Sequence, residues 1–293
     1  MTEEWQAAFV GSGTMAEAMV RGLITRAGMS PARIVASGPR PERGRELAGR
    51  YGIRHGTCNA EAAEGAKLVV LAVKPQVLPA VLPELAGRLR PEALLVSIVA
   101  GARLADLQEG LRHGPAVRAM PNTPAQIGRG MTVWTAAPQV TASQREMARS
   151  LFQTFGEEEE VTEEAHLDRA TALSGTGPAY VFLFLEALVE AGVHLGFSRR
   201  LSEKLVLQTV AGSTAYGQEA GIHLAALRNQ VTSPGGTSAE ALYHLEKGGL
   251  RTVLADAVWA AYRRAVALGE AGAAAGRHTG EVVPWPSHAP SKP

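Results

Sequence analysis

Two glycine-containing stretches near opposite ends of the 293-residue chain have residue types that bind anions. Residues 231–238 read V-T-S-P-G-G-T-S, in which Pro234 fixes one backbone angle and the two glycines after it can adopt positive φ. The chain can therefore turn sharply there and present consecutive N–H groups. Apolar residues at helical spacing follow at once, and Thr237 or Ser238 is suited to the N-cap. Such a turn can hold a carboxylate or phosphate, although an ordinary capped helix has the same features.

The second stretch has the G-x-G-x-x-A pattern of dinucleotide-binding turns and directly follows a short apolar run, residues 6–10. Its first glycine permits the tight turn, its second lets a pyrophosphate approach the backbone, and Ala16 is small enough for the following helix to pack on the strand. The pattern predicts cofactor contacts from Gly11, Ser12, Gly13, Thr14 and Met15.

The end of the next predicted strand, residues 33–37, indicates which dinucleotide is bound. An NAD-selective fold usually has Asp or Glu there, but this chain has Ser37 and then Arg40 and Arg43. We therefore expect NADP(H), with the 2′-phosphate held by Ser37 and by Arg40 or Arg43. This is a preference that leaves NAD(H) possible, since both arginines could equally be solvated residues at a helix start.

Further candidates follow other predicted strands, where an open parallel sheet binds its ligands. Lys74 ends the apolar run 67–73, although a solvated lysine is the commoner case at such a position. Gly101 follows the predicted strand 93–100 and could let a ligand come close. Asn122, between two prolines, could face the nicotinamide or simply turn the chain.

Strands and helices alternate up to about residue 162, with later strands expected at 130–136 and 157–161 and a helix at 143–155. This alternation predicts a doubly wound α/β domain of the Rossmann type over residues 1–162, built on a parallel sheet. Residues 163–276 read as an all-α dimerisation and substrate domain. The proline-rich residues 277–293 are expected to be disordered.

A second subunit is expected from the helix that begins at Pro178, because it carries apolar residues on nearly every face. The remaining helical region is too small to surround it, so we predict a homodimer. The net charge of +1, from 29 basic and 28 acidic residues, implies no nucleic acid. We predict a cytoplasmic protein, because Cys58 is the only cysteine and the first residues are too acidic for a signal peptide. The longest strongly apolar run, 179–185, has only seven residues, which is too short to span a membrane. No metal-binding motif is found in the sequence.

Five motifs in order resemble the pyrroline-5-carboxylate reductase family, from about residue 7 to residue 270. They are GSGTM near the start, AVKPQ at 72–76, VRAMPNTPA at 117–125, TALSGTGPAY at 171–180 and VTSPGGTS at 231–238. The resemblance implies an N-terminal Rossmann domain and a helical dimerisation domain, with dimers that often form larger rings. It implies reduction of L-1-pyrroline-5-carboxylate to L-proline by hydride transfer from NAD(P)H, the last step of proline biosynthesis.

The resemblance also implies roles for individual residues. Glu164 and the pair Thr237 and Ser238 fall where the family holds proline or the pyrroline ring. Three positions depart from the common pattern, namely Thr14, Gln230 and Ser238, and of these the serine keeps its hydroxyl. The implied cofactor contacts are Gly11 to Ala16, Ser37, Asn59, Ala72, Val73, Lys74, Pro75 and Ala100 with Gly101.

The reaction transfers hydride to the C=N carbon and a proton to the nitrogen, so the protein's main task is to orient two rings. We assign the substrate carboxylate to Ser233, Gly236, Thr237 and Ser238, and a proton relay to Thr237 or Ser238. Glu164 could favour the iminium by its charge, or be a solvated carboxylate. The alternatives are another NADP-dependent imine or β-hydroxyacid reductase, which would need a catalytic lysine in the second domain, and a non-catalytic NADP-binding regulator.

Overall fold

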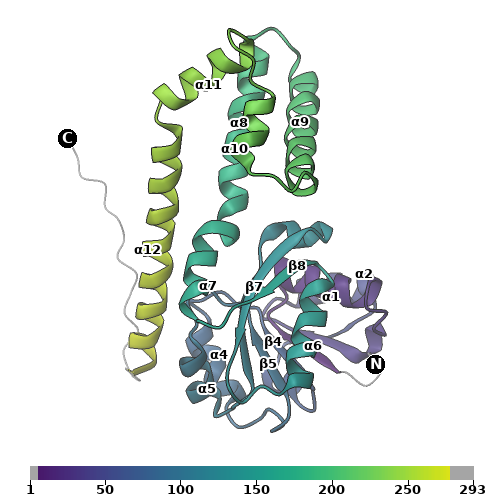
Figure 1. Ribbon diagram of the computed structural model, residues 1–293. Helices are drawn as coiled ribbons and strands as arrows, with labels where there is room; N and C mark the ends of the chain where they lie inside the picture. Colours follow the sequence, from purple (N-terminus) through teal and green to yellow (C-terminus); the bar gives the residue numbers. More distant parts are fainter. Residues whose placement is uncertain (1–5, 278–293) are drawn as a thin grey trace, which may run out of the picture. The chain divides into compact units, whose positions relative to one another are not determined.

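The computed structural model in Figure 1 describes residues 6–277, and side-chain environments within residues 6–270. The chain divides into two compact units. Unit 1 comprises residues 1–170 and 264–293, and unit 2 comprises residues 171–263. The division assigns residues 163–170 and the residues from 264 onward to unit 1, whereas the sequence analysis placed a single boundary at 162/163. The predicted tail lies outside the described residues apart from Arg277.

Unit 1 is built on an eight-stranded sheet with the order β3-β2-β1-β4-β5-β6-β7-β8. All neighbouring strands are parallel except β6 and β7, which are antiparallel. The first six strands have the order of a dinucleotide-binding fold, which confirms the predicted α/β class. The strands are β1 (Ala7–Val10), β2 (Ile34–Ser37), β3 (Arg54–Gly56), β4 (Leu68–Leu71), β5 (Leu94–Ser97), β6 (Ala116–Met120), β7 (Gly130–Ala136) and β8 (Gly156–Glu160).

The central strands are fully buried because helices cover both faces of the sheet (Figure 1). Their short apolar runs made β1, β2, β4 and β5 predictable, whereas β3 was missed because its sequence, R-H-G, is polar. The helices of unit 1 are α1 (Thr14–Thr25), α2 (Pro41–Tyr51), α3 (Asn59–Ala63), α4 (Leu78–Leu85), α5 (Leu104–Leu111), α6 (Ala142–Gln153) and α7 (Ala165–Ala170), with short 3₁₀ turns η2 (Pro31–Arg33) and η3 (Thr123–Ile127).

Unit 2 is entirely helical in its described residues, as predicted. It begins with a π-helical turn, η4 (Thr171–Gly175), and α8 and α9 pack along each other. The helices are α8 (Gly177–His194), α9 (Arg199–Glu219), α10 (Leu224–Gln230), α11 (Thr237–Lys247) and α12 (Leu250–Arg277), the last of which extends from unit 2 into unit 1.

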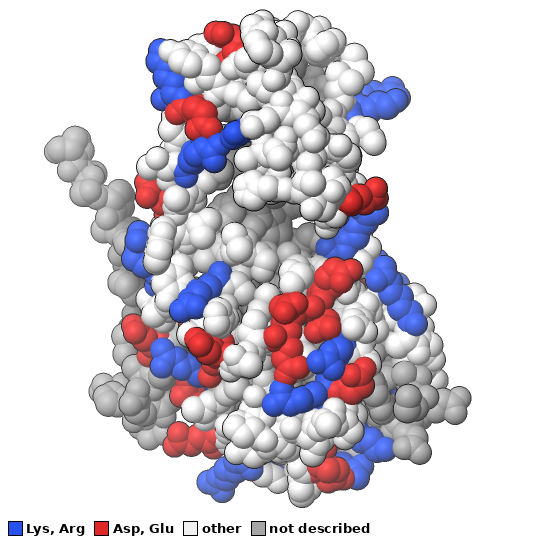
Figure 2. Space-filling model, in the orientation of Figure 1, with Lys and Arg blue, Asp and Glu red and all other residues white. Residues whose placement is uncertain are grey.

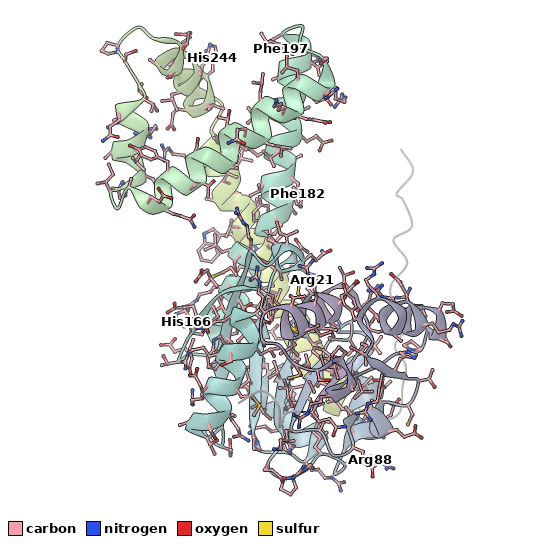
Figure 3. The ribbon with its side chains drawn as sticks, turned by 90° about the vertical axis from the view of Figure 1, so that its right-hand side faces the viewer. Arg21, Arg88, His166, Phe182, Phe197 and His244 are labelled. Carbon is pink, nitrogen blue, oxygen red and sulfur yellow. The ribbon has the colours of Figure 1, made fainter. Side chains whose placement is uncertain are left out.

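The apolar helix α8 is mostly exposed within the single chain, where Val189 is its only buried described residue. Phe182, labelled in Figure 3, is 63% exposed, and Leu183 is 67% exposed. Few charged residues lie on the face of unit 2 seen in Figure 2. The continuous helix 165–194 is also long and apolar enough to cross a membrane by length and composition. The sequence expectation from the seven-residue run did not anticipate this, because it counted only the most apolar part.

Candidate cofactor and substrate sites

The glycine-rich turn after β1 lies against the turn after β4. Gly11 has a φ of +106°, and a Cβ there would be 2.5 Å from the carbonyl oxygen of Ala72. The backbone N–H of Gly11 also donates to the carbonyl of Ser37 at the end of β2 (3.0 Å). The strand ends therefore bring together three of the predicted cofactor segments, the glycine turn, Ser37 and the turn containing Ala72, Val73, Lys74 and Pro75.

The start of α1 is open to an anionic ligand. Gly13 is the N-cap and supplies no side-chain hydrogen bond, so the first N–H groups of the helix, beginning at Thr14 and Met15, are not capped. A Cβ on Gly13 would meet nothing within 4 Å. Ala16 is buried against the sheet, as its small size predicted. The helix dipole and these N–H groups fit the pyrophosphate of a dinucleotide.

Ser37 serves as a support for Asn59 rather than as an exposed ligand. It is fully buried, and its hydroxyl donates to Asn59 Oδ1 (2.7 Å). The amide nitrogen of Asn59 donates in turn to Glu84 Oε2 (2.7 Å). The Ser37 hydroxyl is engaged in this bond, and its contact with the 2′-phosphate stays a prediction. Glu84, which the sequence reasoning missed, fixes the orientation of the Asn59 amide.

The two candidate arginines beside β2 differ in their surroundings. Arg43 forms ion pairs with Glu17 and Glu46, and its Nε donates to the carbonyl of Ser12 (3.1 Å). Arg40 is exposed, and its side chain has no hydrogen bond or ion pair with any residue that the structure describes. Arg40 is therefore available to a phosphate, while Arg43 is already neutralised and braces the glycine turn.

Glu17 is the centre of the ion-pair network around Arg43. Its carboxylate also accepts hydrogen bonds from Arg50 (2.6 Å) and Tyr51 (2.8 Å). Burial by itself raises the pKa of Glu17, but the hydrogen bonds from Arg43 and Tyr51 and the charge of Arg43 outweigh it and hold the pKa below the ordinary 4.5. Glu17 is therefore ionised in the folded protein near neutral pH.

Gly101 is approached by a helix rather than left open for a ligand. Its φ is +77°, and a Cβ there would be 2.9 Å from the backbone nitrogen of Gly269 in α12. The expectation that the missing side chain admits a ligand is therefore wrong for this face of Gly101, because α12 fills the space. Ala100, the preceding predicted cofactor residue, is partly exposed at the same strand-end loop.

Asn122 follows β6, and its side-chain amide is held against β7. Asn122 Oδ1 accepts a hydrogen bond from the backbone N–H of Met131 (2.9 Å). This bond ties the loop between the two prolines to β7. The same atom therefore serves the local turn, and a contact of Asn122 with the nicotinamide stays a prediction.

Glu164 is held by a buried arginine that the sequence reasoning did not single out. Arg118, on β6, is 4% exposed and donates to Glu164 Oε1 (3.0 Å) and to Asp168 (2.6 Å). The same Glu164 oxygen accepts the N–H of Leu104 at the start of α5 (2.9 Å). Glu164 Oε2 has no partner among the described residues. The signal available in the sequence was a charged residue inside a buried strand.

The turn at residues 231–238 precedes α11, but its capping differs from the prediction. Gly236 is the N-cap, so Thr237 and Ser238 are the first two residues of the helix rather than its cap. No side chain caps this end, which leaves the first N–H groups available to an anion. Gly235 has a φ of +68°, and the N–H of Gly236 donates to the carbonyl of Ser233 (3.0 Å), which closes the turn.

The described residues contain no group of three or more His, Cys, Asp or Glu side chains placed to hold a metal ion. The dinucleotide-type sheet with an uncapped helix start after its first strand, followed by an all-helical unit 2, is typical of two-domain, nicotinamide-dependent reductases.

Two family models match the chain in the corresponding places. Residues 6–101 match the family described as NADP oxidoreductase, coenzyme F420-dependent, and residues 164–268 match pyrroline-5-carboxylate reductase dimerisation. The chain is 42% identical to a pyrroline-5-carboxylate reductase from Synechocystis over 90% of its own length and 98% of that protein. It is 38% identical to the Escherichia coli reductase over 85% and 93% of the two lengths. The chain belongs to the pyrroline-5-carboxylate reductase family.

Solved structures agree with this assignment. A Plasmodium falciparum pyrroline carboxylate reductase with NADP bound has a TM-score of 0.85 and 32% identity, covering 92% of this chain and all of that one. The Coxiella burnetii reductase has a TM-score of 0.83 and 36% identity, covering 90% and 98%. The similarity therefore extends over both units, and the family's NADP-bound member agrees with the expected cofactor.

Proposed function

We propose that the chain catalyses the NADP(H)-dependent reduction of L-1-pyrroline-5-carboxylate to L-proline, the last step of proline biosynthesis. It is an oxidoreductase acting on a CH–NH group. The observation that carries the proposal is family membership across both units, at identities of 35–42% to several named reductases. The chain has an uncapped helix start in each unit, one suited to the cofactor pyrophosphate and one to a substrate carboxylate.

In the proposed reaction, hydride passes from the nicotinamide to the C=N carbon, and a proton completes the secondary amine. The bound NADPH supplies the hydride, so the protein has to bind both rings and hold them face to face. A protonated cyclic imine is already electrophilic, and no strongly acidic group is required. This is consistent with a site built from helix N–H groups, hydroxyls and one carboxylate.

We assign the substrate carboxylate to the start of α11. The free N–H groups of Thr237 and Ser238 and the Ser238 hydroxyl can donate to it, and Ser233 and Gly236 shape the turn. Each charge-assisted hydrogen bond contributes about 1.5–3 kcal/mol. Thr237 or Ser238 can also relay the proton to the ring nitrogen.

We assign the ring nitrogen to Glu164. Its Oε1 is occupied by Arg118 and by Leu104, whereas Oε2 can accept an N–H from the iminium or from product proline. A carboxylate that is fixed at one oxygen retains less rotamer freedom, which lowers the entropy lost when substrate binds. The negative charge favours the protonated imine.

For the cofactor, we place the 2′-phosphate at Arg40, with Arg43 as a supporting residue. Asn59, oriented by Ser37 and Glu84, then lies beside the adenosine end of the dinucleotide. A preference for NADPH over NADH follows from the exposed guanidinium of Arg40 and from the absence of a carboxylate at the end of β2.

We further propose a cytoplasmic homodimer in which a second copy covers the apolar residues of α8. The dimerisation family model includes this helix. The match supports a second protein subunit, rather than membrane lipid, as the partner that covers α8. From the family resemblance, we also propose that these dimers assemble into a ring. The expected partners are thus the small-molecule substrate and a second copy of the chain, with no nucleic acid or membrane.

The test is NADPH oxidation by the purified chain with racemic pyrroline-5-carboxylate, followed by chiral analysis of the product. L-proline formed at a catalytic rate is the expected result. NADPH binding without turnover on this substrate, but with turnover on six-membered cyclic imines or β-hydroxyacids, would favour the alternative reductase. Binding without turnover on any of these substrates would favour a non-catalytic regulator.

A further inference from the structure

A hollow of about 290 Å³ lies at the edge of the sheet where the parallel strands begin, opposite the strand ends that form the cofactor site. Its lining contains four cationic side chains, Arg33, Arg54, Lys67 and Arg90. None of its described lining residues is Asp or Glu. The hollow lies within unit 1 and shares no lining residue with the sites assigned above.

The sheet topology explains why these side chains meet. Arg54 begins β3, Arg33 directly precedes β2, Gln6 directly precedes β1, and Lys67 directly precedes β4. These four strands are neighbours in the sheet, in the same order. The backbone N–H of Lys67 donates to the carbonyl of Gln6 (3.0 Å), which ties two of the strand starts together. The row of cations is therefore carried by a rigid part of the fold.

The charge of the row is only partly balanced. Arg90 forms an ion pair with Glu92. The side chains of Arg33 and Arg54 have no hydrogen bond or ion pair with any other described residue. Arg33 and Arg54 therefore bring positive charge to the hollow that no described acidic side chain pairs with. An anion that enters the hollow would relieve the repulsion between them.

We propose that this hollow binds a small, multiply charged phosphate compound at a site separate from the cofactor site. Guanidinium groups donate paired N–H bonds that match phosphate oxygens, and three of the four cations are arginines. The volume is at the lower end of the range for small-molecule pockets, which suits a pyrophosphate or a phosphorylated metabolite rather than a whole dinucleotide.

The experiment is calorimetric titration of inorganic pyrophosphate into the full chain saturated with NADP⁺, at constant ionic strength. Saturation occupies the phosphate subsites of the cofactor site, so any further binding must occur elsewhere. We expect about one equivalent to bind. Arg54→Glu should weaken that binding by about tenfold or more, because a charge-assisted bond becomes a repulsion. The matched control is Arg88→Glu, an exposed arginine outside the lining (Figure 3), which should change the affinity less than about twofold.

The proposal would be overturned if pyrophosphate gave no heat of binding with the NADP⁺-saturated protein. It would also be overturned if Arg54→Glu and Arg88→Glu lowered the pyrophosphate affinity equally, because that result would indicate general attraction to a basic surface. The affinity for NADP⁺ is measured in each variant and should stay within about twofold of the natural chain's value. Salt screening weakens the effect of the introduced charge on the cofactor site at the opposite edge of the sheet.

Discussion

At the scale of single residues, the two arginines after β2 make different predictions. Arg40→Ala should raise the KM for NADPH about tenfold or more and leave the KM for NADH nearly unchanged, because one charge-assisted contact to the 2′-phosphate is lost. Arg43→Ala should affect both cofactors to a similar, smaller extent, because Arg43 is paired with Glu17 and braces the carbonyl of Ser12. Steady-state kinetics with both cofactors distinguish these outcomes. If Arg43→Ala alone abolished the preference for NADPH, the assignment would be reversed.

A second residue-scale prediction concerns Arg118. If it acts through Glu164, Glu164→Ala should raise the KM for pyrroline-5-carboxylate, Arg118→Lys should raise it less, and the double variant should resemble Glu164→Ala alone. Arg145→Lys, in the remote pair with Glu160, is the control for general destabilisation. If the effects of the two single substitutions on this KM were additive, Arg118 would act independently of Glu164. If Glu164→Ala left the KM unchanged, Glu164 would not belong to the substrate site. The NADPH KM should stay constant throughout.

The lowered pKa of Glu17 gives a pH dependence with a definite sign. A carboxyl whose pKa is lower in the folded state stabilises the fold above its unfolded value, 4.5, and this stabilisation is lost as the pH falls through the folded-state pKa. Glu17→Gln should therefore lower the melting temperature at about pH 7 and lessen its decline below pH 4.5. Thermal unfolding of both proteins across this range is the measurement. Parallel curves for the two proteins would contradict the prediction.

At the scale of elements, the turn between β1 and α1 depends on the absence of a side chain at Gly11. Gly11→Ala should cost about 2 kcal/mol or more in unfolding free energy and weaken NADPH binding, because φ is +106° and the new Cβ would press on the Ala72 carbonyl. Gly49→Ala, within α2 and with open space around it, should be neutral or stabilising by up to about 1 kcal/mol. Chemical denaturation and a cofactor titration test both. Equal effects of the two substitutions would contradict the role given to Gly11.

The elements also show where sequence reasoning succeeds. The glycine turn, the buried strands and the helical character of unit 2 depend on short-range patterns, so they were predictable. The partners of the site residues were not, because Arg43 meets Glu17 from 26 positions away and Asn59 meets Glu84 from 25 positions away. Gly101 shows the same limit. The sequence alone does not distinguish a glycine that lets a ligand come close from one that lets a helix pack closely. The predicted cap of α11, Thr237 or Ser238, was one or two residues too late, because glycine, threonine and serine are all acceptable at an N-cap.

At the scale of the whole molecule, the exposed apolar face of α8 implies that a folded single chain is incomplete. We expect the natural protein to sediment as a dimer or larger assembly at micromolar concentration. A variant with Phe182→Asp and Leu183→Asp should sediment as a monomer and lose activity, because the two charges would have to be buried between subunits. Ile127→Asp, at a 70% exposed position in unit 1, should leave the assembly unchanged. A natural protein that sediments as an active monomer, or that is recovered only with membranes, would contradict the proposed dimer.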